Sequence, residues 1–464
     1  MTRSLSFQKS LLLLMLLPIC SRAQTILTDS AAKQLDAAVE GFRQRYHSPS
    51  LVLVIVNDQQ VVYKKASGYI DVDQEVPATV DSKYPVMSVS KLFTATMLMQ
   101  LRHNKMLTLE DDVRKYVPEY PLQGTTLLQL ATHTAGLPRN THADLNFTQQ
   151  IDRWMLGKEN INVLYPSTKQ ELLRSLSKIE REYPVYHFLG YSDRHYSNLG
   201  YSILGIAIER AAHTTHAEYV TSKIFRPLQM NSSGFLTGPK QQDVVAKGYV
   251  YQDSIDTYKR TPFFQPNSAS YAGGIYSTGN DMAKFVSAQF KHNSSILPDA
   301  DKAMMMALNI GWKPSYPYTF HEGSILGYRS EVMISPGKKI GWVILTNSNN
   351  FEFDRVNDVI GKIMDGVVTT APAIALTDYA GTYQLVGTQN TLKIYLKDGS
   401  LYSTYLENDI PAKPLTVSGR RAFKGAGKNG YNIIYEFLTD PNGRVTTLNM
   451  GQLMWRKQDS HTTK

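Results

Sequence analysis

A serine followed three residues later by a lysine is the first spacing in this sequence that could carry chemistry. Five such pairs occur, and their serines are Ser6, Ser30, Ser88, Ser175 and Ser335. Side chains three apart share a helix face, so a lysine amine there can take the proton from a serine that attacks a carbonyl. Only Ser88 follows an extended stretch containing Pro85 and opens an amphipathic helical pattern from Val89 to Leu101.

Two roles are open for Ser88. It can cap the helix by accepting a hydrogen bond from a free backbone N–H, and Lys91 is then simply solvated. It can instead be a nucleophile with Lys91 as its base, because free N–H groups and the positive end of the helix dipole favour the oxyanion formed on attack. Taken alone, the Ser88–Lys91 pair favours the cap.

Two further motifs change that balance. Tyr196-Ser197-Asn198 is the only Tyr-x-Asn in the chain and precedes a helical pattern from Leu199 to Ala212. Its plain alternative is an asparagine cap beside a core tyrosine. His321-Glu322-Gly323-Ser324 is the only His-x-Gly, and its plain alternative is a turn into a hairpin. We expect no metal here, because Ile325 occupies the last position of a zinc-type H-E-x-x-H motif.

The elements that position these motifs are predicted to form an antiparallel sheet with helices packed on it. Residues 51–56 and 60–63 are apolar and favour a buried hairpin, while 329–334 and 340–346 favour a second one around Ser335-Pro336-Gly337. A third helical pattern covers Asp281 to Lys291. Strands at both ends of a helix-rich middle indicate an α/β (α+β) fold whose sheet is built from distant segments.

The composition changes after Asp365, and from Asp378 onward short alternating stretches are separated by Asp398-Gly399, Asn429-Gly430 and Asn442-Gly443. We therefore predict a small, barrel-like antiparallel β domain over residues 369–464, after a main domain over 24–368. Gly425, Gly427 and Gly430 satisfy G-x-G-x-x-G, but no strand-to-helix context follows, so a glycine-rich hairpin is expected rather than a dinucleotide site.

Residues 1–23 are predicted to be a signal peptide, since basic residues precede a short apolar run and Ser21-Arg22-Ala23 suits cleavage. The mature chain is expected to be secreted, periplasmic or extracellular, without stable membrane insertion. Cys20, the single cysteine, lies inside this leader, so no disulfide is expected. A lipid anchor at Cys20 is the alternative, but Ile19 is bulky where lipoprotein leaders carry a small residue.

The formal net charge is +9, and removing Arg3, Lys9 and Arg22 with the leader leaves 46 − 40 = +6. This surplus is spread without a run of consecutive basic residues, so no nucleic-acid partner is expected.

The three motifs, in this order, closely resemble those of the serine β-lactamase and penicillin-binding-protein superfamily, in the branch of class C β-lactamases, D-peptidases and related esterases. The resemblance covers roughly residues 28 to 365 and includes four further segments, Leu127 to Pro138, Phe225 to Phe235, Gly273 to Phe285 and Gly327 to Asn347. It implies a transpeptidase-like domain with an antiparallel sheet flanked by helices and an all-α region.

The resemblance also implies roles for the matched residues. Ser88 looks like the nucleophile, Lys91 its proton acceptor, and Tyr196 the group that shuttles protons and activates the deacylating water. Asn198 is similar to the amide that positions Lys91 and the substrate carbonyl. The backbone N–H groups of Ser88 and Ser324 would form the oxyanion hole, and Gly323 would leave room for the substrate.

The third motif departs from the Lys-Thr-Gly of the lactamases, because His321 replaces the lysine and Glu322 the threonine. A largely neutral histidine and an added carboxylate would weaken the grip on a substrate carboxylate by about 1 to 3 kcal/mol. The substitution leaves the chemistry intact and counts against efficient β-lactam hydrolysis.

The sequence thus predicts a serine hydrolase that acts through a Ser88 acyl-enzyme on ester, amide, D-peptide or β-lactam carbonyls of small molecules or peptides, without cofactors. One alternative is a penicillin-binding or sensor module that acylates without efficient turnover. Another is a non-catalytic binding scaffold, although the complete Ser88, Lys91 and Tyr196 set argues against it. The acyl substrate and the oligomeric state stay open.

Overall fold

The structure is a computed structural model, and it describes residues 27–185, 195–315, 317–367, 375–385, 388–405, 415–419, 422–426, 432–439, 444–450 and 453–458. The signal peptide predicted for residues 1–23 lies outside these ranges, as do Gly427 and Gly430 of the glycine-rich hairpin. Within the described ranges, no helix combines the length and hydrophobicity needed to cross a membrane.

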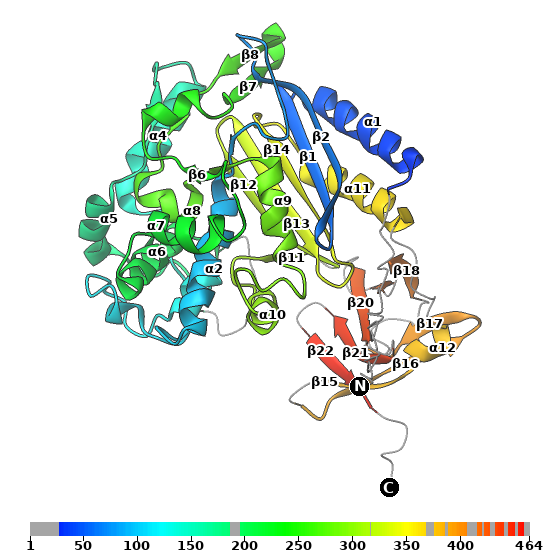
Figure 1. The fold of residues 1–464 in the computed structure, drawn as a ribbon. Coiled ribbons are helices and arrows are strands. Elements are labelled where there is room, and N and C mark those ends of the chain that lie inside the picture. The colour runs from blue at the N-terminus through cyan, green and yellow to red at the C-terminus, as the bar shows by residue number, and fades with distance from the viewer. Residues whose placement is uncertain are drawn as a thin grey trace, which may run out of the picture.

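The main sheet has seven strands in the order β11-β12-β13-β14-β1-β2-β3 (Figure 1), and its pairs are antiparallel. The strands are β1 (Ser50–Asn57), β2 (Gln60–Asp71), β3 (Val76–Pro77), β11 (Lys313–Ser315), β12 (Tyr318–Ile325), β13 (Tyr328–Ser335) and β14 (Ile340–Thr346). Both predicted hairpins are present as β1–β2 and β13–β14, and β1 joins them by pairing with β14. The sheet is therefore assembled from segments far apart in the chain.

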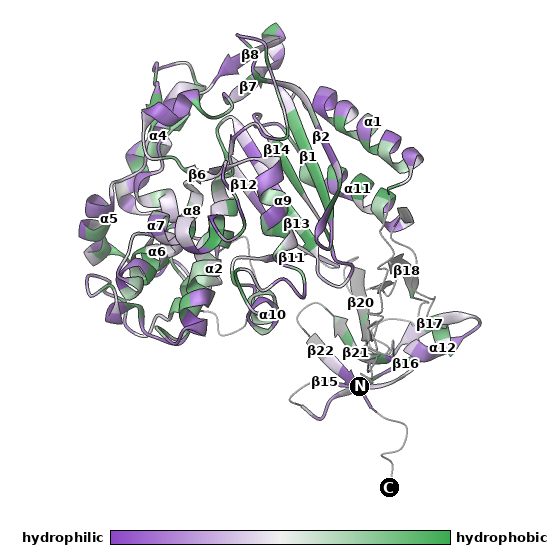
Figure 2. Cartoon of the chain, in the orientation of Figure 1, coloured by the Kyte–Doolittle hydropathy of each residue, from purple (hydrophilic) through white to green (hydrophobic). Residues whose placement is uncertain are grey.

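The continuous apolar run in β1 follows from helices that cover both faces of the sheet. Leu51, Leu53 and Ile55 point into one buried cluster, whereas Val52, Val54 and Val56 point into another. Figure 2 shows β1 hydrophobic along its length, while the helix α1 alternates between hydrophilic and hydrophobic residues. Burial on both faces thus removes the polar positions that a half-exposed strand would show.

Helices from distant parts of the chain make these two layers. On one face, α1 (Asp29–Arg45) and α11 (Phe353–Val367) contribute Leu35, Val39, Val356 and Ile360 to a cluster with Trp342 of β14. On the opposite face, α9 (Gly279–Ser287) packs directly on β1 and β14, and the hydrophobic cluster there continues into α2 (Ser90–His103) and α6 (Asn198–Ala212), which pack on each other. The helix predicted over Asp281 to Lys291 is α9, which begins at Gly279 and ends at Ser287.

The expectation that α2 is amphipathic is wrong. Every residue from Ser90 to Leu101 except Gln100 is buried, because the sheet and other helices surround α2.

The other described helices are α3 (Leu127–Ala131), α4 (Leu145–Met155), α5 (Lys169–Ser175), α7 (His216–Val220), α8 (Ser270–Gly273), α10 (Asp299–Ala307) and α12 (Leu376–Tyr379). Short strands accompany them: β4 (Tyr84–Pro85), β5 (Val163–Leu164), β6 (Gly234–Phe235), β7 (Tyr249–Gln252), β8 (Thr257–Arg260), β9 (Phe263–Phe264) and β10 (Ile275–Ser277).

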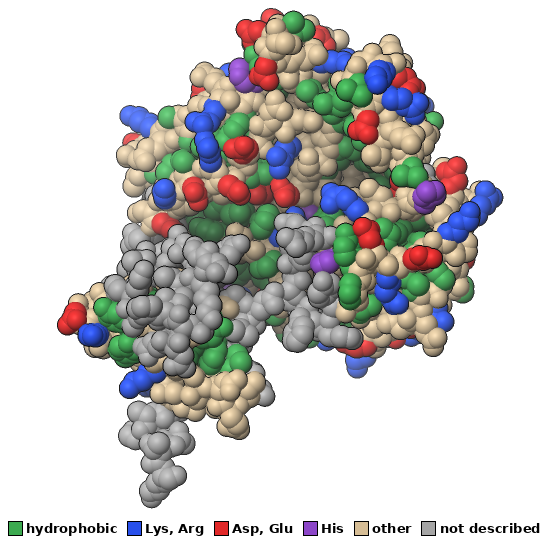
Figure 3. Space-filling model, turned by 180° about the vertical axis from the view of Figure 1, so that it is seen from behind, with side chains coloured by type: hydrophobic (Ala, Val, Ile, Leu, Met, Phe, Trp, Pro, Cys, Tyr) green, Lys and Arg blue, Asp and Glu red, His purple; other side chains and the backbone are tan. Residues whose placement is uncertain are grey.

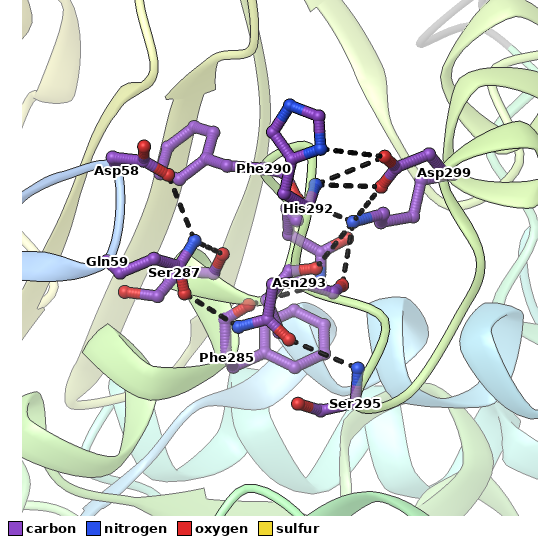
Figure 4. A network of polar contacts seen from close by, with 12 residues as sticks. Asp58, Gln59, Phe285, Ser287, Phe290, His292, Asn293, Ser295 and Asp299 are labelled. Carbon is purple, nitrogen blue, oxygen red and sulfur yellow. Dashed lines mark hydrogen bonds and ion pairs between the residues drawn. The ribbon is translucent and has the colours of Figure 1, made fainter. Parts of the chain in front are cut away.

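A buried lysine fastens the loop that joins α9 to α10. Lys302 Nζ donates to the carbonyl oxygens of Ala288 at 3.3 Å and Asn293 at 2.8 Å, and it pairs with Asp299 at 2.9 Å. Figure 4 shows the surrounding network, in which Asn293 also donates to Gln59 in the turn between β1 and β2. One ammonium group therefore holds a segment that has little regular backbone pairing of its own.

The C-terminal region forms a second, eight-stranded antiparallel sheet in the order β17-β16-β15-β22-β21-β20-β19-β18. Its strands are β15 (Gly381–Leu385), β16 (Thr391–Lys397), β17 (Ser400–Ser403), β18 (Thr416–Gly419), β19 (Ala422–Ala426), β20 (Asn432–Thr439), β21 (Val445–Met450) and β22 (Leu453–Lys457). The N–H of Leu415 donates to Leu401 O at 2.7 Å, which links the two outer strands and brings the sheet close to a barrel. Its hydrophobic core draws on residues between Tyr379 and Trp455.

Charged side chains of both signs are interspersed on the face shown in Figure 3.

The fold confirms the predicted mixed α/β architecture with a helix-flanked antiparallel sheet and a smaller C-terminal antiparallel sheet.

Candidate active site

Ser88 lies in a 3₁₀ turn, Met87–Val89, directly before α2. Val89 rather than Ser88 is the N-cap residue of α2, and Ser88 Oγ accepts a hydrogen bond from Lys91 Nζ, so the geometry does not support the helix-cap role. Met87 has φ of +46°, a left-handed conformation that costs a non-glycine residue free energy and is common at functional sites. Ser330 Oγ of β13 donates to Val86 O at 2.7 Å, which anchors the strained turn to the sheet.

Lys91 is completely buried and points at Ser88 from the first turn of α2. Its Nζ lies 3.1 Å from Ser88 Oγ, 2.9 Å from Asn198 Oδ1 and 2.9 Å from the Ala272 carbonyl oxygen. Burial lowers the pKa of Lys91 well below its usual range, and the charges of Arg139 and Lys313 lower it further. The lysine therefore has the environment that a proton acceptor needs.

Tyr196 lies over the same lysine. Its ring centroid is 4.8 Å from Lys91 Nζ, and His133 packs against it with ring centroids 4.5 Å apart. The N–H of Ser197 donates to His133 Nδ1 at 3.1 Å, so His133 holds the Tyr-Ser-Asn segment in place. Burial lowers the pKa of His133 well below its usual value, which keeps the ring neutral.

Asn198 is the first residue of α6, and Ser197 rather than Asn198 caps that helix by accepting from Gly200 N. Because Ser197 makes the capping hydrogen bond, the Asn198 side chain is available for other contacts. Its Oδ1 accepts a hydrogen bond from Lys91 Nζ, and its Nδ2 donates one to Asn140 Oδ1 at 3.1 Å. These two contacts fix the orientation of the amide.

The His-x-Gly motif lies within β12 and not in a turn before the hairpin. β11 pairs only with residues 318–320 of β12, so the following edge faces the turn that carries Ser88. A Cβ at Gly323 would lie 2.2 Å from Val86 O and 2.9 Å from Ser88 N. Gly323 thus allows the strand to approach the backbone of the nucleophile, which is a different reason for glycine from the predicted room for substrate.

His321 is buried and neutral. Its Nδ1 donates to the Glu322 carbonyl oxygen at 2.8 Å, which leaves Nε2 as an acceptor without a hydrogen-bond partner among the described residues. Burial and the positive charges of Lys313 and Lys91 lower the pKa of His321 well below its usual value. Lys313 of β11 reaches this corner of the site, and sequence reasoning missed it because nothing in its local sequence distinguishes it.

A cavity of about 240 Å³ opens beside Ser88. Ser88, Asn198 and Ser324 line it together with apolar residues, which include Phe147, Ile151, Leu199, Phe264 and Ile325. All the residues that the sequence predicted for catalysis and substrate binding therefore lie in or next to one site. The described residues contain no group of three or more His, Cys, Asp and Glu side chains that could hold a metal.

A helix-flanked antiparallel sheet with a buried Ser-Lys pair, a facing tyrosine and a glycine-containing strand edge defines the superfamily of serine β-lactamases and penicillin-binding proteins. Within it, this chain belongs to the Beta-lactamase family of serine hydrolases, whose sequence profile matches residues 35–362.

Curated proteins from a bacterium and a eukaryote are similar to the chain. Protein flp of Staphylococcus aureus strain MRSA252 is 23% identical over 404 residues, covering 82% of this chain and 75% of that protein. Beta-lactamase-like protein 2 of Dictyostelium discoideum is 27% identical over 277 residues, covering 58% of this chain and 47% of that protein.

Among solved structures, the octameric penicillin-binding protein homologue from Pyrococcus abyssi has a TM-score of 0.61 at 23% identity and covers 93% of this chain and 100% of its own. Because the first 368 of the 464 residues are less than four fifths of the chain, that fold similarity extends into the C-terminal region. A β-lactamase from Sulfitobacter sp. EE-36 has a TM-score of 0.58 at 20% identity, covering 75% of this chain and 100% of its own.

Proposed function

We propose that this chain is a secreted serine hydrolase that attacks an ester, an amide or D-peptide, or a β-lactam carbonyl through a Ser88 acyl-enzyme. The observation that carries the proposal is the 3.1 Å contact between Nζ of the completely buried Lys91 and Oγ of the half-buried Ser88, which faces the cavity. Because burial lowers the pKa of Lys91, the amine is neutral at a pH where an exposed lysine is charged, and it can accept the serine proton.

In acylation, Ser88 Oγ bonds to the substrate carbonyl carbon while its proton passes to Lys91. The N–H groups of Ser88 and Ser324 stabilise the oxyanion, a role supported by the closeness of β12 to Ser88 N. Tyr196, stacked over Lys91, delivers a proton to the leaving group as the carbonyl bond to that group breaks. Water then attacks the acyl-enzyme and loses its proton to Tyr196. As the bond between the acyl carbon and Ser88 Oγ breaks and the acid leaves, Lys91 returns its proton to Ser88.

The proposed substrates are small molecules or peptides, and the reaction needs no metal or organic cofactor, since each step uses a side chain of this site. The neutral His321 in the place of a lysine argues for esters or peptides ahead of β-lactams. The proposal includes neither a nucleic-acid partner nor insertion into a membrane.

The decisive experiment is time-resolved intact mass spectrometry of the mature protein with an activated nitrophenyl ester and, separately, a penicillin. We expect a transient adduct with continuing release of product, and loss of both in Ser88→Ala. Ser30→Ala is the matched control, because Ser30 also begins a Ser-x-x-Lys pair but lies exposed on α1.

A persistent adduct without product release would instead identify a penicillin-binding or sensor module. If neither probe gives a Ser88-dependent adduct or product, D-amino-acid peptides are the next substrates, and their failure too would leave a non-catalytic scaffold.

Export and cleavage of the leader also belong to the proposal. Expression of the full chain in a bacterial host with periplasmic fractionation should give a mature protein that begins at Gln24, measured by intact mass. A cytoplasmic protein that keeps residues 1–23 would contradict this part alone.

A further inference from the structure

The cavity beside Ser88 has a continuous apolar wall. Met87 and Phe264 belong to one hydrophobic cluster, and the wall is completed by residues that pack against that cluster, namely Phe147, Ile151 and Ile325. All five of these residues also line the cavity. Because a single cluster supplies them, they form a connected surface rather than scattered apolar contacts.

The helix α4 supplies one side of this wall. Phe147, Ile151 and Trp154 follow one another at helical spacing, so they form a stripe along one face of α4. Trp154 is buried in the cluster, whereas Phe147 and Ile151 are half-buried and border the cavity. The ring centroids of Phe147 and Phe264 lie 5.8 Å apart. The extent of the cavity on this side therefore depends on Phe147 and Ile151.

The apolar wall begins on both sides of the proposed oxyanion hole. Met87 directly precedes Ser88, and both line the cavity. Ile325 directly follows Ser324, and both line it as well. Tyr196 is not among the described residues that line the cavity. Since Tyr196 serves the leaving group in the proposed mechanism, the leaving group belongs outside the cavity and the acyl group belongs inside it.

Several polar groups at the cavity already bind other parts of the protein. Asp144 accepts a hydrogen bond from the Ser167 N–H at 2.8 Å, and the hydroxyls of Ser268 and Ser167 lie 3.2 Å apart. Arg139 also lines the cavity, but it is exposed, and its guanidinium lies 5.0 Å from the centroid of the Tyr196 ring. An anionic acyl group held by Arg139 is therefore the alternative to an apolar one.

The volume of the cavity limits the size of the acyl group. An apolar cavity of about 150 Å³ takes up benzene, so one of about 240 Å³ has room for an acyl chain of about six carbons. We propose that the acyl group transferred to Ser88 is apolar and of this size, and that Phe147 and Ile151 set the accepted chain length. The inference rests on the proposed function, because it names the acyl class for the same site.

The test compares kcat/KM for nitrophenyl acetate and nitrophenyl hexanoate, which share a leaving group and differ only in chain length. The wild type should prefer hexanoate by about 10- to 100-fold, since an apolar pocket favours the longer chain. In Ile151→Trp the larger side chain fills the cavity, so the ratio of hexanoate to acetate should fall at least about 10-fold. Met155→Trp is the matched control and should keep the wild-type ratio, because Met155 lies exposed on α4 and is not among the described lining residues.

Phe147→Ala covers the case in which Ile151→Trp does not fold. It enlarges the cavity and should move the preferred ester from hexanoate to octanoate. Damage to the fold would lower kcat/KM for all esters together, whereas the two variants should move the preferred chain length in opposite directions. The same chain-length preference in the wild type and in both folded variants would overturn the proposal.

Nitrophenyl hydrogen adipate tests the anionic alternative, because a carboxylate replaces the end of the hexanoate chain. We expect its kcat/KM to be at least about 10-fold below that of hexanoate, since the apolar wall cannot compensate for desolvating the charge. A preference for adipate would overturn the proposal, and loss of that preference in Arg139→Gln would identify Arg139 as the partner of the anion. Absence of Ser88-dependent hydrolysis of acetate and hexanoate alike would count against the proposed function and, with it, this inference.

Discussion

At the scale of single residues, the site keeps its histidines out of acid–base chemistry. His133 and His321 both contact or approach Tyr196, and burial lowers the pKa of each well below its ordinary value. In the proposed mechanism, proton transfer therefore falls to Lys91 and Tyr196. His133 has a mechanical role, because it accepts a hydrogen bond from the backbone next to Tyr196.

Replacing Tyr196 by Phe should separate the two halves of the reaction. The ring and its packing on His133 are kept, but the hydroxyl that would activate the deacylating water is lost. We expect the acyl-enzyme to break down at least 100-fold more slowly, since general base catalysis typically contributes 10² to 10⁴-fold. The measurement is the decay of the ester adduct by intact mass, and unchanged decay would remove Tyr196 from the mechanism.

Replacing Gly323 by Ala should damage catalysis more than stability. The new Cβ would lie 2.2 Å from Val86 O, a backbone atom, so β12 must move away from Ser88. The N–H of Ser324 then leaves the oxyanion, and we expect the acylation rate to fall by about 10²- to 10³-fold. Gly337→Ala serves as the control, since a Cβ there meets nothing within 4 Å. A Gly323→Ala variant with wild-type acylation would show that this close approach has no part in catalysis.

Glu331 should make the protein less stable as the pH rises. It is buried in β13, one of its oxygens has no partner among the described residues, and burial raises its pKa to about 8 from 4.5. Between these values the unfolded chain loses the proton while the folded protein keeps it. The free energy of unfolding therefore falls with rising pH, by about 3 to 5 kcal/mol across the window.

Glu331→Gln should remove this dependence, because the amide is neutral throughout. Urea denaturation at pH 5 and pH 8 measures it, with exposed Glu110→Gln as the control. If wild type and Glu331→Gln lose the same stability between the two pH values, Glu331 is ionised in the folded protein.

At the scale of elements, local sequence patterns predict what lies within an element better than what meets between elements. The helices around Lys91 and after Asn198, and both hairpins, follow from apolar spacing alone. The amphipathic reading of α2 failed because neighbours enclose it on all sides. Lys313 could not be found, since it reaches the site only through the register of β11 on β12.

The loop between α9 and α10 should depend on Lys302. Lys302→Met would leave several carbonyl oxygens without this donor and would remove the ion pair with Asp299, so we expect a loss of about 2 to 4 kcal/mol in the free energy of unfolding. Lys291→Met, in the same loop but exposed, should change stability by less than about 0.5 kcal/mol. Equal effects of the two substitutions in urea denaturation would contradict the anchoring role.

At the scale of the whole molecule, we propose that residues 24–368 and 369–464 are separate domains. The C-terminal sheet has its own hydrophobic core, and each of the three motifs lies before residue 368. A chain that ends at residue 368 should unfold cooperatively and still be labelled at Ser88 by a fluorophosphonate. A truncated protein that is insoluble or unfolded by circular dichroism would place the boundary elsewhere.

The pairing of β1 with β14 also sets the order in which the molecule can be completed. Leu51 pairs with Thr346, so the centre of the sheet joins residues 346 − 51 = 295 positions apart. Closing so long a loop is entropically costly and slow, and during synthesis β1 cannot pair with β14 until residue 346 has been made. The central pair of strands therefore forms only after more than two thirds of the chain has been made.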